Sequence, residues 1–401
     1  MSERCDILIV GGGLVGASLA IALERAGRRV VMVEAMAPRT GGGASYDERN
    51  LALARASVNG LQWLGVWPLA AAQSTPIRQI HISRAGDFGA VRLYAERMGI
   101  DALGHTLPAR ELGNALQQRL AQCQRLQRHA PARLVAVEPR DGGWRARIEA
   151  GDGGTLEIDA ALLVGADGSE SFVRRALGIA ADRFDYRQAL FVATVTPQRA
   201  PDGRAFERFS DAGPVALLPL AAGRAGLVLT VAADEADEVA ALDDDAFIAL
   251  AQTRFGHRLG RLQRPGKRQP WVIQRVAARS LVAPRAVLVG NAAQTLHPIG
   301  AQGFNLGLRD ALTLAELAAE GDPGDPAMLA EYAARRRVDR EGVMAFSHGL
   351  ARLACAPQGP LSPLRSLSML ALQQPAWRHA VARRGMGFHG RAPRAVLERQ
   401  P

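Results

Sequence analysis

The sequence is poor in cysteine. Its three cysteines, Cys5, Cys123 and Cys355, are widely spaced and form no C-x-x-C pair. This pattern favours a reducing compartment and argues against a disulfide framework or a zinc site. The eight histidines include no H-E-x-x-H motif, so we expect no structural metal.

Lysine and aromatic residues are also scarce. Lys267 is the only lysine, so arginine supplies nearly all of the positive charge behind the net charge of +10. Such a charge can indicate nucleic acid or an anionic membrane as a partner. The abundance of alanine and glycine beside arginine instead fits codon bias, and 5% aromatic residues leave little material for base stacking. We therefore expect no nucleic-acid partner.

Long uninterrupted apolar runs are missing. The longest, residues 215–233, is broken by Pro219, Gly223 and Arg224. The first twenty residues do not resemble a signal peptide, because Glu3 and Asp6 interrupt them and three glycines follow the apolar run. We expect no membrane-spanning segment and a cytoplasmic protein, either free or peripheral on the inner face of the cytoplasmic membrane.

The chain has 401 residues, 48% of them hydrophobic, which is enough for two or three domains. An apolar run at 6–10, glycines at 11–13, helical spacing over 14–27 and a second apolar run at 29–34 predict a β-α-β unit. Runs at 160–164 and 286–289, each stopped by glycine, are expected to join the same parallel sheet. Runs at 189–196, 205–209, 215–220 and 225–232 predict an antiparallel sheet.

These patterns predict an α/β fold with a Rossmann-like, discontinuous dinucleotide-binding domain over 1–72, 100–182 and 276–345. Segments 73–99 and 183–275 form an inserted, sheet-bearing substrate domain. After Asp310 the chain is expected to be helical apart from a proline-rich break at 356–363, and 346–401 form a helical C-terminal segment.

The first motif, Gly11-Gly12-Gly13-Leu14-Val15-Gly16, has the G-x-G-x-x-G spacing between a strand and a helix. Gly11 would allow the tight turn, Gly13 would let a pyrophosphate approach the backbone, and Gly16 would let helix and strand pack closely. The helix N-terminus attracts phosphates. Glu34, at the end of the second strand, would accept hydrogen bonds from a ribose hydroxyl.

Two further motifs follow strands of the same sheet. Residues 165–174 begin Gly-Ala-Asp-Gly, and Asp167 there is equally well explained as a helix cap. Residues 290–310 form a strand end, a loop of proline and small residues, and a helix whose free N–H groups begin near Gly303. Such a loop lets a flat, oxygen-rich ligand lie against backbone donors.

Together the three motifs resemble the flavin-dependent aromatic hydroxylases, the single-component monooxygenases that include para-hydroxybenzoate hydroxylase. The resemblance covers essentially the whole chain and implies FAD, with NAD(P)H as co-substrate. In that family NAD(P)H reduces FAD, and a flavin C4a-hydroperoxide formed with O2 hydroxylates an electron-rich ring. The resemblance implies these cofactor-binding residues: Gly11, Gly13, Gly16, Glu34, Arg49, Arg110, Asp167, Gly168, Asn291, Gly303, Asn305 and Leu306.

Within the family, segments 203–209, 213–214, 218–219 and 290–298 are similar to the bacterial hydroxylases that act on 2-polyprenyl-6-methoxyphenol in ubiquinone biosynthesis. Asn291 and Gln294 stand where most of the wider family has aspartate and histidine, which favours this branch. Gly300-Ala301 stands where Ala-Gly is expected, beside the flavin. The implied partners are a polyprenylphenol, O2, and either the membrane surface or a complex of quinone-pathway enzymes.

The sequence identifies no catalytic base. His297 and Pro298 are expected near the isoalloxazine, but a loop histidine without an identified acid partner can equally serve a positioning role. Three alternatives stay open beside the polyprenylphenol hydroxylase. They are a hydroxylase of a small soluble aromatic, a flavin-dependent reductase of isoprenoid chains, and a flavoprotein scaffold without catalysis.

The C-terminal segment mixes apolar and arginine side chains. It could place its apolar residues at an anionic surface while the arginines meet lipid phosphates. The alternative is a helical lid packed on the main domains, because apolar residues at helical spacing are usually core. The residues concerned are Leu361, Leu364, Leu367, Met369, Leu370, Leu372 and Trp377, among Arg365, Arg378, Arg383, Arg384, Arg391 and Arg394.

Overall fold

The computed structural model describes residues 3–37, 49–354, 362–388 and 391–397. Asp47 and Glu48, which precede Arg49, and most of the proline-rich break lie outside these ranges. Within them no helix combines the length and apolar character that a bilayer crossing requires.

The predicted parallel sheet is confirmed. Among the described residues, its central order is β19-β11-β1-β2-β8, and every neighbouring pair in it is parallel. The short β18 pairs antiparallel with β19. Strands β9 and β10 form an antiparallel hairpin, and β10 also pairs antiparallel with β11. The strands are β1 Glu3–Val10, β2 Val30–Val33, β8 Leu126–His129, β9 Ala132–Arg140, β10 Gly143–Ala150, β11 Thr155–Gly165, β18 Val282–Ala283 and β19 Ala286–Leu288.

The second sheet has the order β20-β17-β12-β15-β14-β13-β5-β6, with β16 beside β12. The four runs predicted from the sequence, now β12 to β15, pair antiparallel as predicted, and β5 joins this sheet parallel to β13. The cause is that β5 enters from an earlier part of the chain, and a long crossover permits parallel pairing. The strands are β5 Gln79–Arg84, β6 Ala90–Tyr94, β12 Ala181–Pro197, β13 Arg204–Phe209, β14 Val215–Pro219, β15 Ala225–Ala232, β16 Leu262–Gln263, β17 Gln269–Ala278 and β20 Gln294–Thr295.

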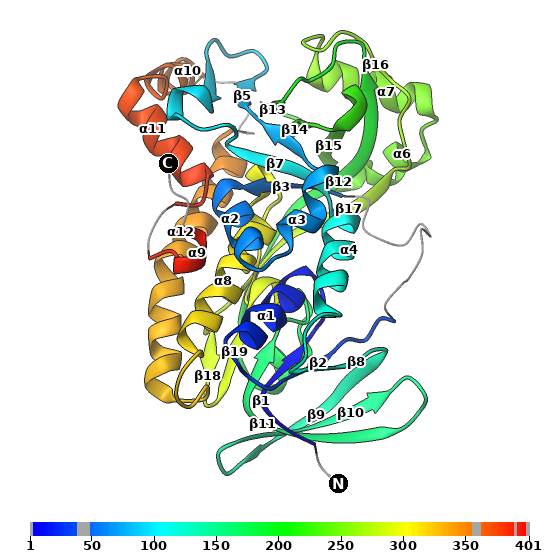
Figure 1. Cartoon of the computed structure of the whole chain (residues 1–401). Coiled ribbons are helices and arrows are strands. Elements are labelled where there is room, and N and C mark those ends of the chain that lie inside the picture. Colours follow the sequence, from blue (N-terminus) through cyan, green and yellow to red (C-terminus); the bar gives the residue numbers. More distant parts are fainter. Residues whose placement is uncertain (1–2, 38–48, 355–361, 389–390, 398–401) are drawn as a thin grey trace.

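A third, small sheet of β3 (Asn50–Ala54), β7 (Gly104–Pro108) and β4 (Thr75–Ile77) lies between the two larger ones (Figure 1). The longer helices are α1 Leu14–Arg25, α2 Arg55–Trp63, α4 Ala109–Leu120, α7 Asp244–Phe255, α8 Gln302–Leu317, α9 Pro326–Ala354, α10 Ser362–Ala371 and α11 Pro375–Gly385. The short ones are α3 Trp67–Ala70, α5 Phe172–Ala176, α6 Ala236–Ala241 and α12 Arg394–Leu397, and the 3-10 turns are η1 Ala71–Gln73, η2 Glu96–Met98, η3 Ala221–Gly223, η4 Ala233–Glu235, η5 Gly290–Ala292 and η6 Ile299–Ala301.

The main hydrophobic core lies around the parallel sheet. Strand residues such as Ile7, Leu162 and Val287 are fully buried in it. Helices α1, α2, α4 and α8 contribute buried residues to the same core. A separate core packs α6 and α7 on one face of the second sheet, with Phe191, Leu217 and Phe247 at its centre. We propose that segment 73–99 belongs to the same domain as 183–275, because β5 pairs with β13 along its whole length.

Candidate functional site

The three sequence motifs meet at the carboxyl edge of the parallel sheet. Val10, at the end of β1, lies opposite Gly165 at the end of β11, and Gly165 lies opposite Leu288 at the end of β19. The Ala166 N–H donates to the Val10 carbonyl at 2.8 Å. Since ligands of open α/β sheets bind outside the carboxyl ends of the strands, this edge is the candidate site.

The glycines of the first motif occupy two kinds of environment. A Cβ added at Gly11 would stand 2.4 Å from the Ala166 carbonyl oxygen, and one at Gly16 would stand 1.9 Å from the Gly11 carbonyl oxygen. Gly11 also has a φ of +104°. Gly13, by contrast, has no atom within 4 Å of an added Cβ, and no side chain caps α1. Open space therefore faces the free N–H groups of this helix, as a phosphate requires.

Glu34 is held beside the same turn. Its Oε2 accepts a hydrogen bond from the Gly12 N–H at 2.6 Å, and its Oε1 accepts one from the Met36 N–H at 2.8 Å. These backbone donors fix the carboxylate at the end of β2. Each oxygen keeps a further lone pair for a ligand hydroxyl.

The Asp167 side chain makes its hydrogen bonds within the protein. Its carboxylate accepts hydrogen bonds from the Val173 N–H at 3.0 Å and from the Ser171 hydroxyl at the start of α5. The helix-cap interpretation therefore accounts for this carboxylate. Gly168 has a φ of +83° and open space at its Cβ position, so contact with a ligand here would come from the backbone.

The third motif forms a turn before the N-terminus of α8. No side chain caps this helix, and Gly303 in its first turn has open space around it. The Asn305 side chain points inward, accepting from the Ala54 N–H at 2.9 Å and donating to the Ala52 carbonyl at 2.9 Å. Leu306 is fully buried. At Asn305 and Leu306, therefore, only backbone atoms remain to contact a cofactor.

The Gly300-Ala301 order has a structural consequence. Gly300 has a φ of +68°, and Ala301 has a φ of +50° and a ψ of 40°. The left-handed conformation costs an L-residue with a Cβ about 1–2 kcal/mol. The expected Ala-Gly order would place glycine at the second position, so the swap leaves a strained alanine directly before α8.

The two arginines implied by the resemblance lie outside the glycine cluster, Arg49 directly before β3 and Arg110 in the first turn of α4. Arg49 stacks on the Trp271 ring of the second sheet at 4.8 Å, and its carbonyl accepts from the Ala109 N–H. Arg110, the second residue of α4, is exposed and contacts Glu111 at 3.1 Å. Asn291 is exposed in η5.

His297 is unsuited to the role of a catalytic base. It is 1% exposed, its Nδ1 accepts from the Ile299 N–H, and its Nε2 lies 3.1 Å from the Gln188 Oε1. Burial, and then the nearby His348, lowers its pKa to about 4. The imidazole is therefore neutral and both nitrogens are in use, so it orients the loop that continues through Pro298 into η6.

Sequence reasoning missed a buried ionic network beneath this loop. The Asp310 carboxylate accepts from the Gly290 N–H at 3.1 Å, the Gln294 amide at 2.6 Å and the Arg336 guanidinium at 2.6 Å. Arg336 also contacts Asp339, which pairs with Arg309. This network ties both ends of the third motif to α9. The adjacent charges Arg309 and Asp310 inside an apolar helix were the signal available in the sequence.

Comparison with known proteins identifies the class. The FAD binding domain family matches residues 4–347, and the chain belongs to that family. The open glycine cradle, the uncapped N-termini of α1 and α8 and the fixed Glu34 carboxylate suit the phosphates and ribose of FAD. The protein is an FAD-dependent aromatic monooxygenase.

Particular relatives narrow the class. The chain is 37% identical over 374 residues to the ubiquinone hydroxylase UbiL of Rhodospirillum rubrum, covering 92% of this chain and 86% of that protein. It is 29% identical to the 3-demethoxyubiquinol 3-hydroxylase of Escherichia coli, covering 93% and 96%. The crystal structure of p-nitrophenol 4-monooxygenase from Pseudomonas putida shares the fold, with a TM-score of 0.80, 18% identity and coverage of 97% and 99%.

Proposed function

We propose that this protein hydroxylates the aromatic ring of a polyprenylphenol, such as 2-polyprenyl-6-methoxyphenol, in ubiquinone biosynthesis. The similarity to the Rhodospirillum ubiquinone hydroxylase over 92% of the chain carries the proposal. In the reaction, the phenol, O2, NAD(P)H and a proton give the hydroxylated phenol, NAD(P)+ and water. One oxygen atom enters the ring and the other leaves as water.

The chain's own residues would bind and orient the cofactor. The backbone around Gly11, Gly13 and Gly16 and the N-terminus of α1 would hold the pyrophosphate, and Glu34 would accept from the ribose. The backbone of Gly168, Gly303, Asn305 and Leu306 would line the rest, with Arg49, Arg110 and Asn291 at the periphery. Bound FAD supplies hydride acceptance and oxygen activation. His297 and Pro298 would shape the loop nearest the ring system.

Labelled oxygen tests the proposal directly. We expect the FAD-loaded protein, given NADH or NADPH, a short-chain prenylated phenol and ¹⁸O₂, to form a product with one ¹⁸O atom on the ring. The matched control is the same phenol without its prenyl chain, which should turn over more slowly because the chain contributes binding free energy. Oxidation of NAD(P)H that yields only hydrogen peroxide would contradict the proposal.

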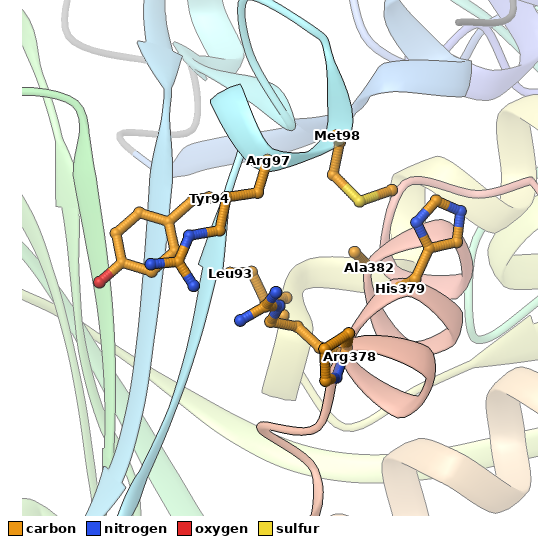
Figure 2. A pocket seen from close by; sticks show the side chains of 8 residues that line it. Leu93, Tyr94, Arg97, Met98, Arg378, His379 and Ala382 are labelled. Carbon is orange, nitrogen blue, oxygen red and sulfur yellow. The ribbon is translucent and has the colours of Figure 1, made fainter.

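We also propose that the C-terminal helices attach the protein to an anionic membrane surface, where such a substrate resides. Leu367, Leu370 and Trp377 on α10 and α11 are 55%, 42% and 64% exposed. Helix α11 also lines a pocket of about 140 Å³ with a basic rim (Figure 2). Its lining residues are Leu93, Tyr94, Arg97, Met98, Pro375, Arg378, His379 and Ala382. Cations beside exposed apolar groups suit lipid phosphates.

The same C-terminal segment also packs on the main body of the protein. Met386, Phe388 and Val396 are buried in the main core, and the Asn59 amide donates to the Val396 carbonyl. The lid alternative thus accounts for part of the segment. Removing all of residues 361–401 would strip the core, so point substitutions are the sharper test. The side chains of Leu361, Leu364 and Arg365 lie outside the described residues.

The attachment predicts a loss of vesicle binding in a double variant. Leu367→Gln with Trp377→Gln should weaken co-sedimentation with phosphatidylglycerol vesicles at least about 100-fold, because each of the two apolar side chains contributes on the order of 1.5–3 kcal/mol when buried. Val338→Gln, at an equally exposed apolar side chain of α9, is the control and should bind normally. Equal binding by both variants would contradict membrane attachment through this segment.

A further inference from the structure

A row of directly paired residues crosses the strands of the second sheet, and only one side chain in this row is ionisable. Glu207 on β13 lies opposite Ile82 of β5 and opposite Ala216 of β14. Ala216 in turn lies opposite Val228 of β15, and Val228 lies opposite Val192 of β12. Directly paired residues project on the same face of a sheet. Glu207 is therefore the one carboxyl in this row, whose members from Ile82 to Val192 are otherwise apolar and which ends at Gln269 of β17.

This row faces the third motif. Phe209, two residues after Glu207 and so on the same face, packs with Ile299 of η6, and Ile82 packs against the cluster that they form with Ala351. The neighbouring residue Phe206 projects to the other face, where its ring meets Phe255 of α7 at 5.6 Å. The Glu207 carboxyl thus projects on the side of the sheet turned toward the loop that precedes α8.

Glu207 has no hydrogen-bond or ion-pair partner among the residues that the structure describes. It is half-buried. A half-buried carboxyl beside apolar neighbours, with no partner among the described residues, is free to accept a hydrogen bond from a ligand. Burial raises the pKa of this carboxyl from 4.5 to about 8.

The other charged and titratable groups on this face are engaged elsewhere. Arg84 pairs with Asp211, and Tyr186 contacts His348 at 3.1 Å. The charged and titratable groups on this face are Arg49, which stacks on Trp271, and Arg84, Asp211, Tyr186, Arg275, His297 and His348.

We propose that Glu207 is a catalytic residue, the base that accepts the hydroxyl proton of the phenol substrate. This inference rests on the proposed function. In the step, the phenol O–H bond breaks, a carboxyl O–H bond forms on Glu207, and the electron pair stays on the phenol oxygen. The resulting phenolate has an electron-rich ring, which the insertion of an electrophilic oxygen atom requires. No oxidant or reductant is needed for this transfer.

The direction of the pH dependence follows. Only the deprotonated carboxyl can accept a proton, so hydroxylation should rise with pH up to about 8 and then level off. Stability should show the opposite trend. Because the folded-state pKa of this acid lies above its unfolded value, the folded chain binds more protons between pH 4.5 and about 8, and stability falls as pH rises through that window.

The test compares FAD-loaded wild type with Glu207→Gln, and with Glu238→Gln, an exposed glutamate of α6, as the matched control. The first readout is the absorbance change when a prenylated nitrophenol binds, because phenolate and phenol absorb at different wavelengths. We expect wild type and Glu238→Gln to bind this probe as phenolate, and Glu207→Gln to bind it as phenol. The second readout is the pH profile of single-turnover hydroxylation of a prenylated phenol. Only in Glu207→Gln should the rate stop rising with pH, and only there should it fall at least 100-fold.

Each outcome decides a separate point. Hydroxylation by wild type with an unchanged profile and unchanged probe ionisation in Glu207→Gln would overturn the role of Glu207 and leave the proposed function standing. Probe ionisation that depends on Glu207, without oxygen insertion by wild type, would support the proton acceptor and overturn the proposed function. If wild type inserts no oxygen and the probe ionisation does not depend on Glu207, both the role of Glu207 and the proposed function are overturned. Unfolding of Glu207→Gln, followed by circular dichroism, checks the fold and should lose the pH trend described above.

Discussion

Replacement of Asp310 by alanine should lower the free energy of unfolding by about 3–5 kcal/mol. Asp310 and Arg336 have side chains only 2% and 1% exposed, and they lie 2.6 Å apart. The substitution leaves the Arg336 charge buried with one carboxylate fewer, and it leaves the Gly290 N–H and the Gln294 amide without their acceptor. A single change thus removes three buried hydrogen bonds.

The matched control for this prediction is Asp322→Ala. Asp322 pairs with Arg285 at 2.6 Å, but the Asp322 side chain is 44% exposed, so water replaces the lost partner. We expect a loss of about 1 kcal/mol or less. Denaturant unfolding of the two cofactor-free variants measures both values. Equal losses for the two substitutions would show that the Asp310 network does not stabilise the fold.

Replacement of Gly13 by valine should abolish FAD binding while the chain still folds. The added side chain enters open space, where no atom of the protein lies within 4 Å of the Cβ. That space is where a pyrophosphate would approach the helix N-terminus, so the cofactor and not the protein meets the clash. The purified wild type is expected to be yellow with non-covalent FAD, and Gly13→Val is expected to be colourless.

Two further glycines separate the effect on FAD from the effect on folding. Gly16→Val should disrupt the fold itself, because its Cβ would stand 1.9 Å from the Gly11 carbonyl oxygen. Gly385→Val, at the end of α11 with nothing near its Cβ, should keep both fold and colour. FAD released by heat and measured by fluorescence gives the occupancy of each variant. Full occupancy in Gly13→Val would contradict the proposed position of the pyrophosphate.

The parallel sheet and its three motifs could be predicted from the sequence because their signals are local. A short apolar run followed by glycine marks a buried strand and its turn wherever it occurs, and the runs at 6–10, 160–164 and 286–289 each became a strand of one sheet. The mixed second sheet could not be predicted in full. The position of β5 beside β13 depends on a pairing between residues more than a hundred positions apart, which no local pattern records.

The sequence by itself determined which backbone positions must be glycine and which chemistry the carboxyl edge can bind, since turns and helix N-termini are encoded by neighbouring residues. Only the tertiary structure decided the roles of ionisable side chains. Asp310 became an internal acceptor, His297 a neutral positioning group, and Glu207 an acid among apolar walls. The physical reason is that the charge state of a side chain depends on burial and partners, and folding brings both from distant parts of the chain.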